Sequence, residues 1–235
     1  MPFEISSVCM IIEYLLFIST IEINFFPILK TCRIRCHNNF SDYRIMPKTK
    51  KIEKKMTGKK APSVKIRTRV RDSRLKNKEN PYKWKTMKTN NMFKNKKTVV
   101  FSLPGAYTPT CSSKHLPDYE KHTKDLKKLG IDNVYCVSVN DAFVMNNWAK
   151  KLKIKNVEMI PDGNGEFTRK MSAMVPKDNL GFGERSWRYS MYVDNGKIKK
   201  IFEEPGMRPN CKTDPFTCSD VHTMMKYLKD VKVSN

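Results

Sequence analysis

Residues 99–111 read VVFSLPGAYTPTC, and this stretch decides the fold of the chain. Its first five residues are mostly β-branched or apolar and predict a short buried strand, which the Pro-Gly pair ends. Thr108 is a good N-cap residue, and Pro109 suits the first position of a helix. The pattern therefore predicts a strand followed by a helix that carries Cys111 in its first turn.

Cys111 is expected where a helix favours negative charge. The first N–H groups of a helix have no partner within it, and the helix dipole has its positive end there. A thiolate is an anion and is the reactive form of cysteine, so this position favours a nucleophile. A buried, inert side chain is the commoner role of a cysteine, and the local sequence alone leaves both interpretations open.

Three separated segments resemble the peroxiredoxins, and within them the type-5 (plant type II) subfamily. They are the active-site signature Pro104-x-x-x-Thr108-x-x-Cys111 with the HLP that follows it, VSVNDAFVM at residues 137–145, and RYSM at residues 188–191. The segments occur in the order that the family has, and the resemblance runs from about residue 62 to the C-terminus.

Helical and strand patterns alternate after Cys111. The expected elements are a helix that Pro117 kinks and Gly130 ends, a strand at 133–139, a helix from Asp141 to Leu152, a strand at 157–160, a short helix at 167–171, a hairpin of 188–193 and 197–202 about Asn195-Gly196, and a helix at 220–231. This order predicts an α/β fold with a mixed central sheet and helices on both faces. The resemblance implies the thioredoxin-like form of that fold.

The resemblance also implies roles for residues of these motifs. Cys111 would attack a peroxide and become a sulfenic acid. Arg188 would supply fixed positive charge to the thiolate and to the transition state, and Thr108 would offer its hydroxyl to the sulfur or the peroxide. Pro104 would shield the pocket from water. The remaining pocket positions are Gly105 and Tyr107.

Two further cysteines could resolve the sulfenic acid. Cys136 follows Cys111 by 25 residues, as in the plant-like members, and Cys218 stands where the animal-like members keep their resolving cysteine. The favoured interpretation is a one-cysteine peroxidase whose sulfenic acid is reduced by glutathione or a glutaredoxin. The alternatives are a two-cysteine, thioredoxin-dependent peroxidase and a redox sensor that passes oxidation to a partner protein.

Other uses of Cys111 fit the sequence less well. His115 shares its helix side, as in a cysteine-protease pair, but no third residue is evident to orient that histidine. A dithiol oxidoreductase needs Cys-x-x-Cys, and Cys111 is followed by Ser-Ser-Lys. The histidine and cysteine spacing indicates no metal site, so we expect no cofactor besides glutathione as a co-substrate. The resemblance implies a homodimer.

Residues 47–100 hold most of the positive charge. They contain 20 lysines and arginines against three acidic residues, which is +17 of the chain's +23. The stretch could be an arm that binds nucleic acid or an anionic membrane, a targeting segment poor in acidic residues, or a solvated, partly disordered linker. Because the charge is concentrated in this one stretch, we expect no nucleic-acid partner.

An apolar segment precedes the basic stretch. Residues 5–29 are long enough to span a bilayer, but they include Glu13 and Glu22, and an acidic residue at the centre of a membrane helix costs about 2.5–3.5 kcal/mol. The two segments together resemble the leader of proteins sent through the secretory route to a secondary plastid. For the apolar segment, the alternatives are a retained membrane anchor and a misassigned start or idle extension. For the location, they are another organelle and the cytoplasm. The expected domains are a signal-like segment at 1–29, a basic leader at 30–61, and a peroxiredoxin domain at 62–235 that contacts no membrane.

Overall fold

The computed structural model describes residues 52–75 and 79–233. The signal-like segment and the leader up to residue 51 lie outside the described residues. Within the described part, no helix is long and apolar enough to cross a membrane.

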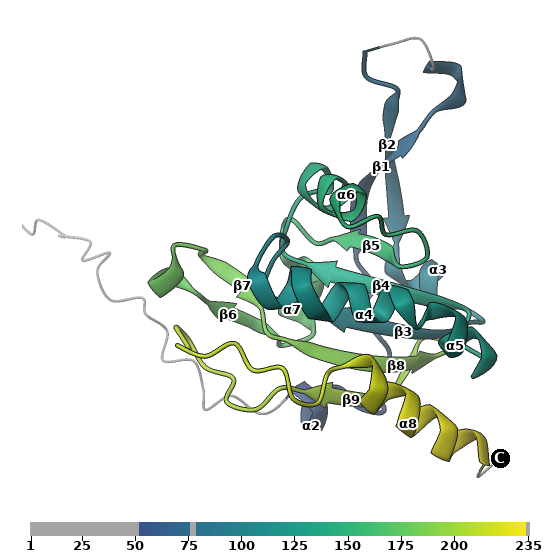
Figure 1. Cartoon of the computed structure of the whole chain (residues 1–235), viewed down its shortest axis with the longest axis vertical. Coiled ribbons are helices and arrows are strands. Elements are labelled where there is room, and N and C mark those ends of the chain that lie inside the picture. The colour runs from purple at the N-terminus through teal and green to yellow at the C-terminus, as the bar shows by residue number, and fades with distance from the viewer. Residues whose placement is uncertain (1–51, 76–78, 234–235) are drawn as a thin grey trace, which may run out of the picture. The chain divides into compact units, whose positions relative to one another are not determined.

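Five strands form the central sheet in the order β5-β4-β3-β8-β9 (Figure 1). They are β3 (Lys97–Ser102), β4 (Asn133–Ser138), β5 (Glu158–Pro161), β8 (Tyr189–Asp194) and β9 (Lys197–Glu203). β3 runs parallel to β4, and β4 to β5, whereas β8 and β9 join antiparallel. This mixed sheet confirms the thioredoxin-like fold class and places β3, with the turn that follows it, at its centre.

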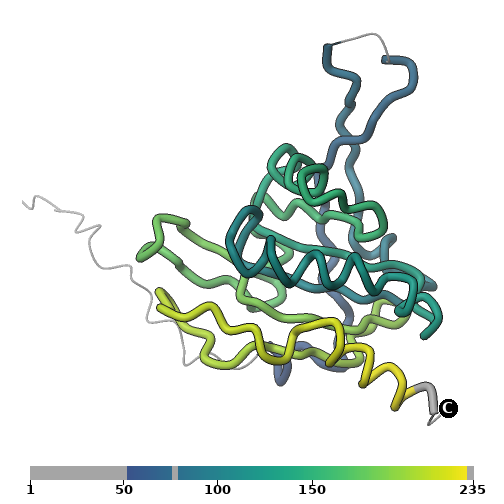
Figure 2. Tube along the Cα trace, in the orientation of Figure 1, coloured from purple at the N-terminus to yellow at the C-terminus, as the bar shows by residue number. Residues whose placement is uncertain are grey.

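Helices cover both faces of the sheet (Figures 1 and 2). One face packs against α4 (Leu116–Lys121), α5 (Thr123–Lys128), α6 (Ala142–Lys151) and α8 (Val221–Val233). The other packs against α2 (Ile52–Met56), α3 (Thr89–Phe93) and α7 (Glu166–Lys170). Because side chains alternate along a strand, Phe101 of β3 belongs to the first core and Val100 to the second. A short antiparallel pair, β6 (Met174–Pro176) and β7 (Glu184–Ser186), precedes β8.

The predicted hairpin, the central strands and the cap at Asp141 are present, whereas the predicted N-cap Thr108 donates its hydroxyl to the Gly105 carbonyl instead. Asp141 caps α6 by accepting from the N–H groups of Phe143 and Val144. Asn195 and Gly196 both have positive φ, 45° and 76°, as a two-residue hairpin turn requires.

The long helix expected after Cys111 differs from the prediction. It consists of a π-helical segment, Cys111–His115, followed by α4 and α5, and the break lies at His122 rather than at Pro117. Pro117 stands in the first turn of α4, where its missing N–H removes no hydrogen bond of that helix.

Of the interpretations left open for the basic stretch, a solvated linker does not hold for the described residues. Ile52 and Met56 of α2 are buried, and the N–H of Gly58 donates to the Ile198 carbonyl at 2.8 Å. Residues 52–61, which we assigned to the leader, thus pack on β9. Few apolar residues suffice here because the sheet supplies the other half of the core. The position at which a leader would be cleaved stays a prediction.

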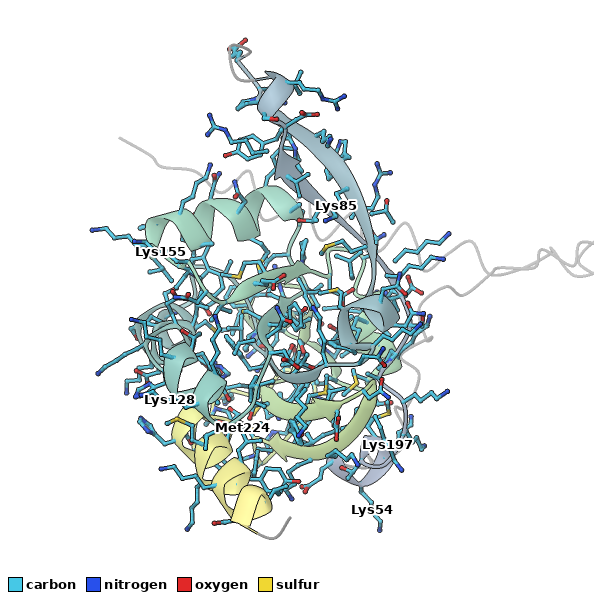
Figure 3. All side chains as sticks on the ribbon, turned by 90° about the vertical axis from the view of Figure 1, so that its right-hand side faces the viewer. Lys54, Lys85, Lys128, Lys155, Lys197 and Met224 are labelled. Atoms are coloured by element: carbon cyan, nitrogen blue, oxygen red, sulfur yellow. The ribbon has the colours of Figure 1, made fainter. Side chains whose placement is uncertain are left out.

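Further along the basic stretch, β1 (Lys65–Arg71) and β2 (Tyr82–Lys88) form a hairpin, which extends beyond α6 (Figure 1). The Arg69 guanidinium lies 4.7–5.6 Å from the ring centroids of Tyr82, Trp84 and Phe143, so cation–π contacts fasten the hairpin to α6. Most lysines of the described residues are exposed, whereas Lys177 is buried. Figure 3 shows exposed side chains that point outwards at Lys54, Lys85, Lys128, Lys155 and Lys197.

Candidate active site

The turn between β3 and the following helix is held by internal hydrogen bonds. Tyr107 adopts a positive φ of 65°, and the Thr108 hydroxyl donates to the Gly105 carbonyl at 2.8 Å. The Asn140 side chain, from the loop after β4, accepts from the Ala106 N–H at 3.0 Å. The turn is thereby fixed both from within and from the neighbouring strand, and the Thr108 hydroxyl serves the turn as a donor.

Cys111 opens the π-helical segment and is fully buried. The helix itself begins at Pro109, as predicted. Trp148 of α6 donates its indole N–H to the Ser112 hydroxyl at 3.0 Å, which ties the segment to α6. π-helical turns are frequent at functional sites, but no feature of the sequence indicated this one.

Arg188 lies beside Cys111 although 77 residues separate them. It directly precedes β8, and the pairing of Ser102 with Tyr189 brings that end of β8 to the end of β3. Its Nη1 is 3.5 Å from the Cys111 Sγ, and the side chain is 1 % exposed. Burial lowers the pKa of the guanidinium, but Cys111 and Asp214 outweigh burial and raise it, so the positive charge is permanent.

His115 holds Arg188 rather than Cys111. Its Nε2 is 3.2 Å from the carbonyl of Ser219, which can only accept, so Nε2 carries the proton. Its Nδ1 then accepts from Arg188 Nη1 at 3.1 Å. Burial and the neighbouring guanidinium hold the pKa of His115 well below its ordinary value, so the ring is neutral. This arrangement leaves no ring nitrogen for the cysteine-protease type of pairing weighed above.

Two residues missed by the sequence analysis complete the surroundings of Arg188. Asp214 accepts from Arg188 Nη2 at 2.5 and 2.6 Å. The Phe216 ring lies 5.6 Å from the guanidinium and 4.8 Å from the His115 ring. Both belong to the loop between β9 and α8. No sequence signal could have identified them, because their contacts depend on how that loop folds back.

The Cys136 and Cys218 side chains have different environments, and neither is bonded to Cys111, since all four cysteines of the described residues are free. Cys136 lies on β4 in the same core as Cys111, and burial raises its pKa well above the ordinary value. Cys218 is half-buried, and its thiol donates to the Glu203 carbonyl at 3.2 Å. Burial, followed by the Glu204 carboxylate, raises the pKa of Cys218 to about 11.

Glu204 fixes the loop that carries Cys218. Its carboxylate is 1 % exposed and accepts from the N–H groups and hydroxyls of Thr217 and Ser219 and from the N–H of Cys218, at 2.7–3.0 Å. Burial raises the pKa of this carboxyl, but the hydrogen bonds together lower it, so it stays ionised. The Glu204 N–H also donates to the Arg188 carbonyl at 3.2 Å, which links the loop to the arginine.

The remaining predicted pocket residues lie on the turn. Pro104 and Gly105 are buried, and Tyr107 is exposed with the Lys151 ammonium over its ring. A separate cleft of about 360 Å³ lies between the β1–β2 hairpin, the start of α6 and the end of β5. None of the predicted site residues lines it. Among the described residues, no three His, Cys, Asp or Glu side chains converge to hold a metal ion.

Several known proteins resemble this chain in sequence and in fold. The model of the Redoxin family matches residues 56–214. A peroxiredoxin of Synechocystis is 56% identical over 174 residues, which are 74% of this chain and 92% of the relative. The hybrid peroxiredoxin of Haemophilus influenzae is 52% identical over 173 residues, which are 74% of this chain and 66% of the relative.

Among solved structures, the Plasmodium falciparum antioxidant protein, described as a 1-Cys peroxiredoxin, superposes with a TM-score of 0.68. The match is 36% identical and covers 74% of this chain and 99% of that one. The sequence and the fold therefore point to the same family.

Proposed function

The chain belongs to the redoxin family as a peroxiredoxin of the type-5 (type II-like) group, hence a thiol peroxidase, and from that premise we propose that Cys111 is its peroxidatic nucleophile and that glutathione or a glutaredoxin recycles it. The observation that carries the assignment of Cys111 is the buried Arg188 guanidinium 3.5 Å from its sulfur. A fixed positive charge so close stabilises a thiolate and costs no rearrangement when charge moves in the reaction.

The reaction begins when the Cys111 thiolate attacks the terminal oxygen of a peroxide R–O–OH. An S–O bond forms, the O–O bond breaks, and the cysteine becomes a sulfenic acid while R–O⁻ leaves and takes up a proton. Arg188 Nε has no partner among the described residues, so it can donate to the peroxide as negative charge passes to the leaving oxygen. The Thr108 hydroxyl donates a hydrogen bond to the Gly105 carbonyl, so the lone pairs of the hydroxyl oxygen remain to accept from the peroxide O–H. Pro104, buried in the turn, keeps water from the sulfur.

Peroxide consumption by the full chain tests the assignment of the nucleophile. Hydrogen peroxide and an organic hydroperoxide are supplied with glutathione and glutaredoxin, and the chain is compared with Cys111→Ser. We expect complete loss in the variant. Turnover that survives in Cys111→Ser would contradict the assignment, and no consumption by the unmutated chain with any thiol donor would contradict the peroxidase itself.

The one-cysteine cycle is supported by the states of the other two thiols. Cys136 is fully buried, and Cys218 has a raised pKa and a thiol already engaged by a backbone carbonyl. The P. falciparum relative is itself described as a 1-Cys peroxiredoxin. We expect Cys136→Ser and Cys218→Ser to keep the turnover with glutathione and glutaredoxin.

The alternative is a two-cysteine cycle with thioredoxin as the reductant. Cys218 is the better candidate because it lies on the loop whose Ser219 carbonyl contacts His115, within reach of the site by local rearrangement. Turnover with thioredoxin that disappears in Cys218→Ser, or in Cys136→Ser, would favour this cycle. A chain that is oxidised once by peroxide and then transfers the oxidation to another protein would favour a redox sensor.

The assembly and location of the protein are part of the same proposal. A homodimer is supported by large apolar side chains that stay exposed in the single chain, among them Tyr107, Phe143, Leu180 and Phe182. The apolar and basic segments of residues 1–51 support delivery to a plastid through the secretory route. Light scattering of the full chain tests the dimer, and imaging of residues 1–61 fused to a fluorescent protein tests the location.

A further inference from the structure

Both terminal nitrogens of the Arg188 guanidinium have partners, and the partners differ in charge. At Nη1 it meets the neutral ring of His115 and the Cys111 sulfur, and at Nη2 it meets the Asp214 carboxylate. The charge of the sulfur changes in every turnover, because a thiolate becomes a sulfenic acid and is then restored. Asp214 is thus the one anionic contact of Arg188, among the described residues, that the reaction leaves unaltered.

The loop that presents Asp214 is itself fastened to Arg188. Its last residues, 217–219, are bound to the buried Glu204 carboxylate. The backbone N–H of Glu204 donates to the Arg188 carbonyl, so the backbone of the arginine and the loop share one anchor. Phe216, from the same loop, lies against the guanidinium. The loop therefore fixes the guanidinium by charge at one end and by ring contact beside it.

We propose that Asp214 is a positioning residue for peroxide reduction, which keeps the Arg188 guanidinium in the orientation that faces both Sγ and the incoming peroxide. The proposal rests on the function proposed above. A guanidinium is planar and presents its N–H groups in a rigid fork. Fixing Nη2 therefore also fixes the direction of Nε and Nη1, the two groups that can reach the peroxide and the sulfur.

An effect of charge and an effect of position have opposite signs here. A carboxylate beside Arg188 offsets part of the positive charge that favours the Cys111 thiolate. If Asp214 acted only through charge, its neutral replacement would make Cys111 more reactive towards any electrophile. If Asp214 acts by position, the replacement slows the reaction with peroxide, which needs the aligned arginine, and does not slow a reaction that needs only the thiolate.

The experiment compares two reactions of Cys111 in the full chain and in Asp214→Asn. Stopped-flow tryptophan fluorescence gives the rate constant for oxidation by hydrogen peroxide, and mass spectrometry of the Cys111 peptide gives the rate of alkylation by iodoacetamide. We expect oxidation to slow by about tenfold, as for a lost catalytic hydrogen bond of modest strength, with alkylation unchanged or faster. Asp214→Glu, which restores the charge, should recover most of the oxidation rate.

The matched control is Asp178→Asn, the same change at an exposed aspartate that precedes β7, and it should alter neither rate. Oxidation by Asp214→Asn at the unmutated rate would overturn the proposal, as would an equal fall in both reactions. Failure of the proposed function would appear differently, because the unmutated chain would then show no reaction with peroxide at Cys111.

Discussion

Cys111 and Cys218 lie at opposite ends of one hydrogen-bond network, and their environments have opposite charge. The network runs from the Cys111 sulfur through Arg188 and His115 to the Ser219 carbonyl, and from Ser219 to the Glu204 carboxylate. Cys111 faces a guanidinium, whereas burial and the carboxylate beside Cys218 together raise the pKa of its thiol to about 11. The comparison teaches that membership of the same network does not give two thiols the same surroundings, because the nearest permanent charge is positive at Cys111 and negative at Cys218.

We expect the largest effect on the oxidation rate when the guanidinium next to Cys111 is replaced by an ammonium group. Arg188→Lys keeps the charge but loses the planar fork that contacts Sγ, His115 and Asp214. We expect the rate constant for oxidation by hydrogen peroxide to fall by about 10²–10³-fold, the usual cost of removing a preorganised donor. The same change at Arg169, an exposed arginine paired with Glu184, is the control and should leave the rate unaltered. A fall of less than threefold at Arg188 would contradict the comparison.

The next effect concerns the reactivity of the Cys218 thiol, at the other end of the network. A pKa of about 11 against an ordinary 9.0 makes the thiolate of Cys218 about 100-fold scarcer at pH 7.5. Alkylation of Cys218 in the folded chain should therefore be about two orders of magnitude slower than in the urea-unfolded chain, and should keep rising with pH to beyond pH 10. Both are followed by mass spectrometry of the Cys218 peptide. A plateau near pH 9 would show that neither burial nor the carboxylate raises the pKa of this thiol.

Removing the negative charge of Glu204 tests how much of the low reactivity of Cys218 is due to that carboxylate. Glu204→Gln keeps the shape of the side chain but takes the anion away from Cys218, and we expect its alkylation to become about tenfold faster. Because the buried carboxylate accepts several hydrogen bonds, the variant should also lose about 2 kcal/mol of unfolding free energy in urea. The surface change Glu184→Gln is the control for both measurements. Unchanged alkylation of Cys218 would assign its raised pKa to burial alone.

The ionised state of Glu204 also sets an acid limit. Its pKa in the fold is lowered, so the unfolded chain binds the proton more readily, and the stabilisation is present above the ordinary glutamate pKa of about 4.3 and lost as the pH falls below it. The unfolding free energy should drop below pH 4 more steeply in the unmutated chain than in Glu204→Gln. Parallel curves would contradict this.

The surroundings of Cys111 and those of Cys218 were not equally predictable from the sequence. Cys111 and Arg188 stand in motifs of fixed spacing, and adjacent strands bring those motifs together, so a resemblance could identify both. Asp214, Phe216 and Glu204 act through a loop that folds back on the site, and their contacts join residues with no periodic relation. The π-helical segment at Cys111 was not predicted either, and its Ser112 contacts Trp148 of α6, a residue with no periodic relation to it.

The difference between local pattern and long-range contact also explains why the folding of the basic stretch was not predicted. Ile52, Met56, Ile66 and Phe93 are too widely spaced to form a core by themselves, and charge therefore dominates the pattern. Each nevertheless fills a place on the far face of the central sheet. Local composition describes what a segment can do alone, whereas its burial depends on surfaces supplied by residues elsewhere in the sequence.

The smallest effect is the dependence of stability on the protonation of His115, which links Arg188 to the Ser219 carbonyl. Its pKa lies well below the ordinary value because of burial and Arg188, so the unfolded chain takes up the proton first as the pH falls. Its contribution to stability is complete above about pH 6.5 and declines below it, by about 1.4 kcal/mol per pH unit once the unfolded form is protonated. Urea unfolding at pH 7.5 and 5.5 should show this loss in the unmutated chain and a smaller one in His115→Gln. His222→Gln, at an exposed histidine of α8, is the control and should keep the full loss. An equal loss in all three chains would mean that His115 is protonated in the fold, and the neutral link between Arg188 and Ser219 would then be wrong.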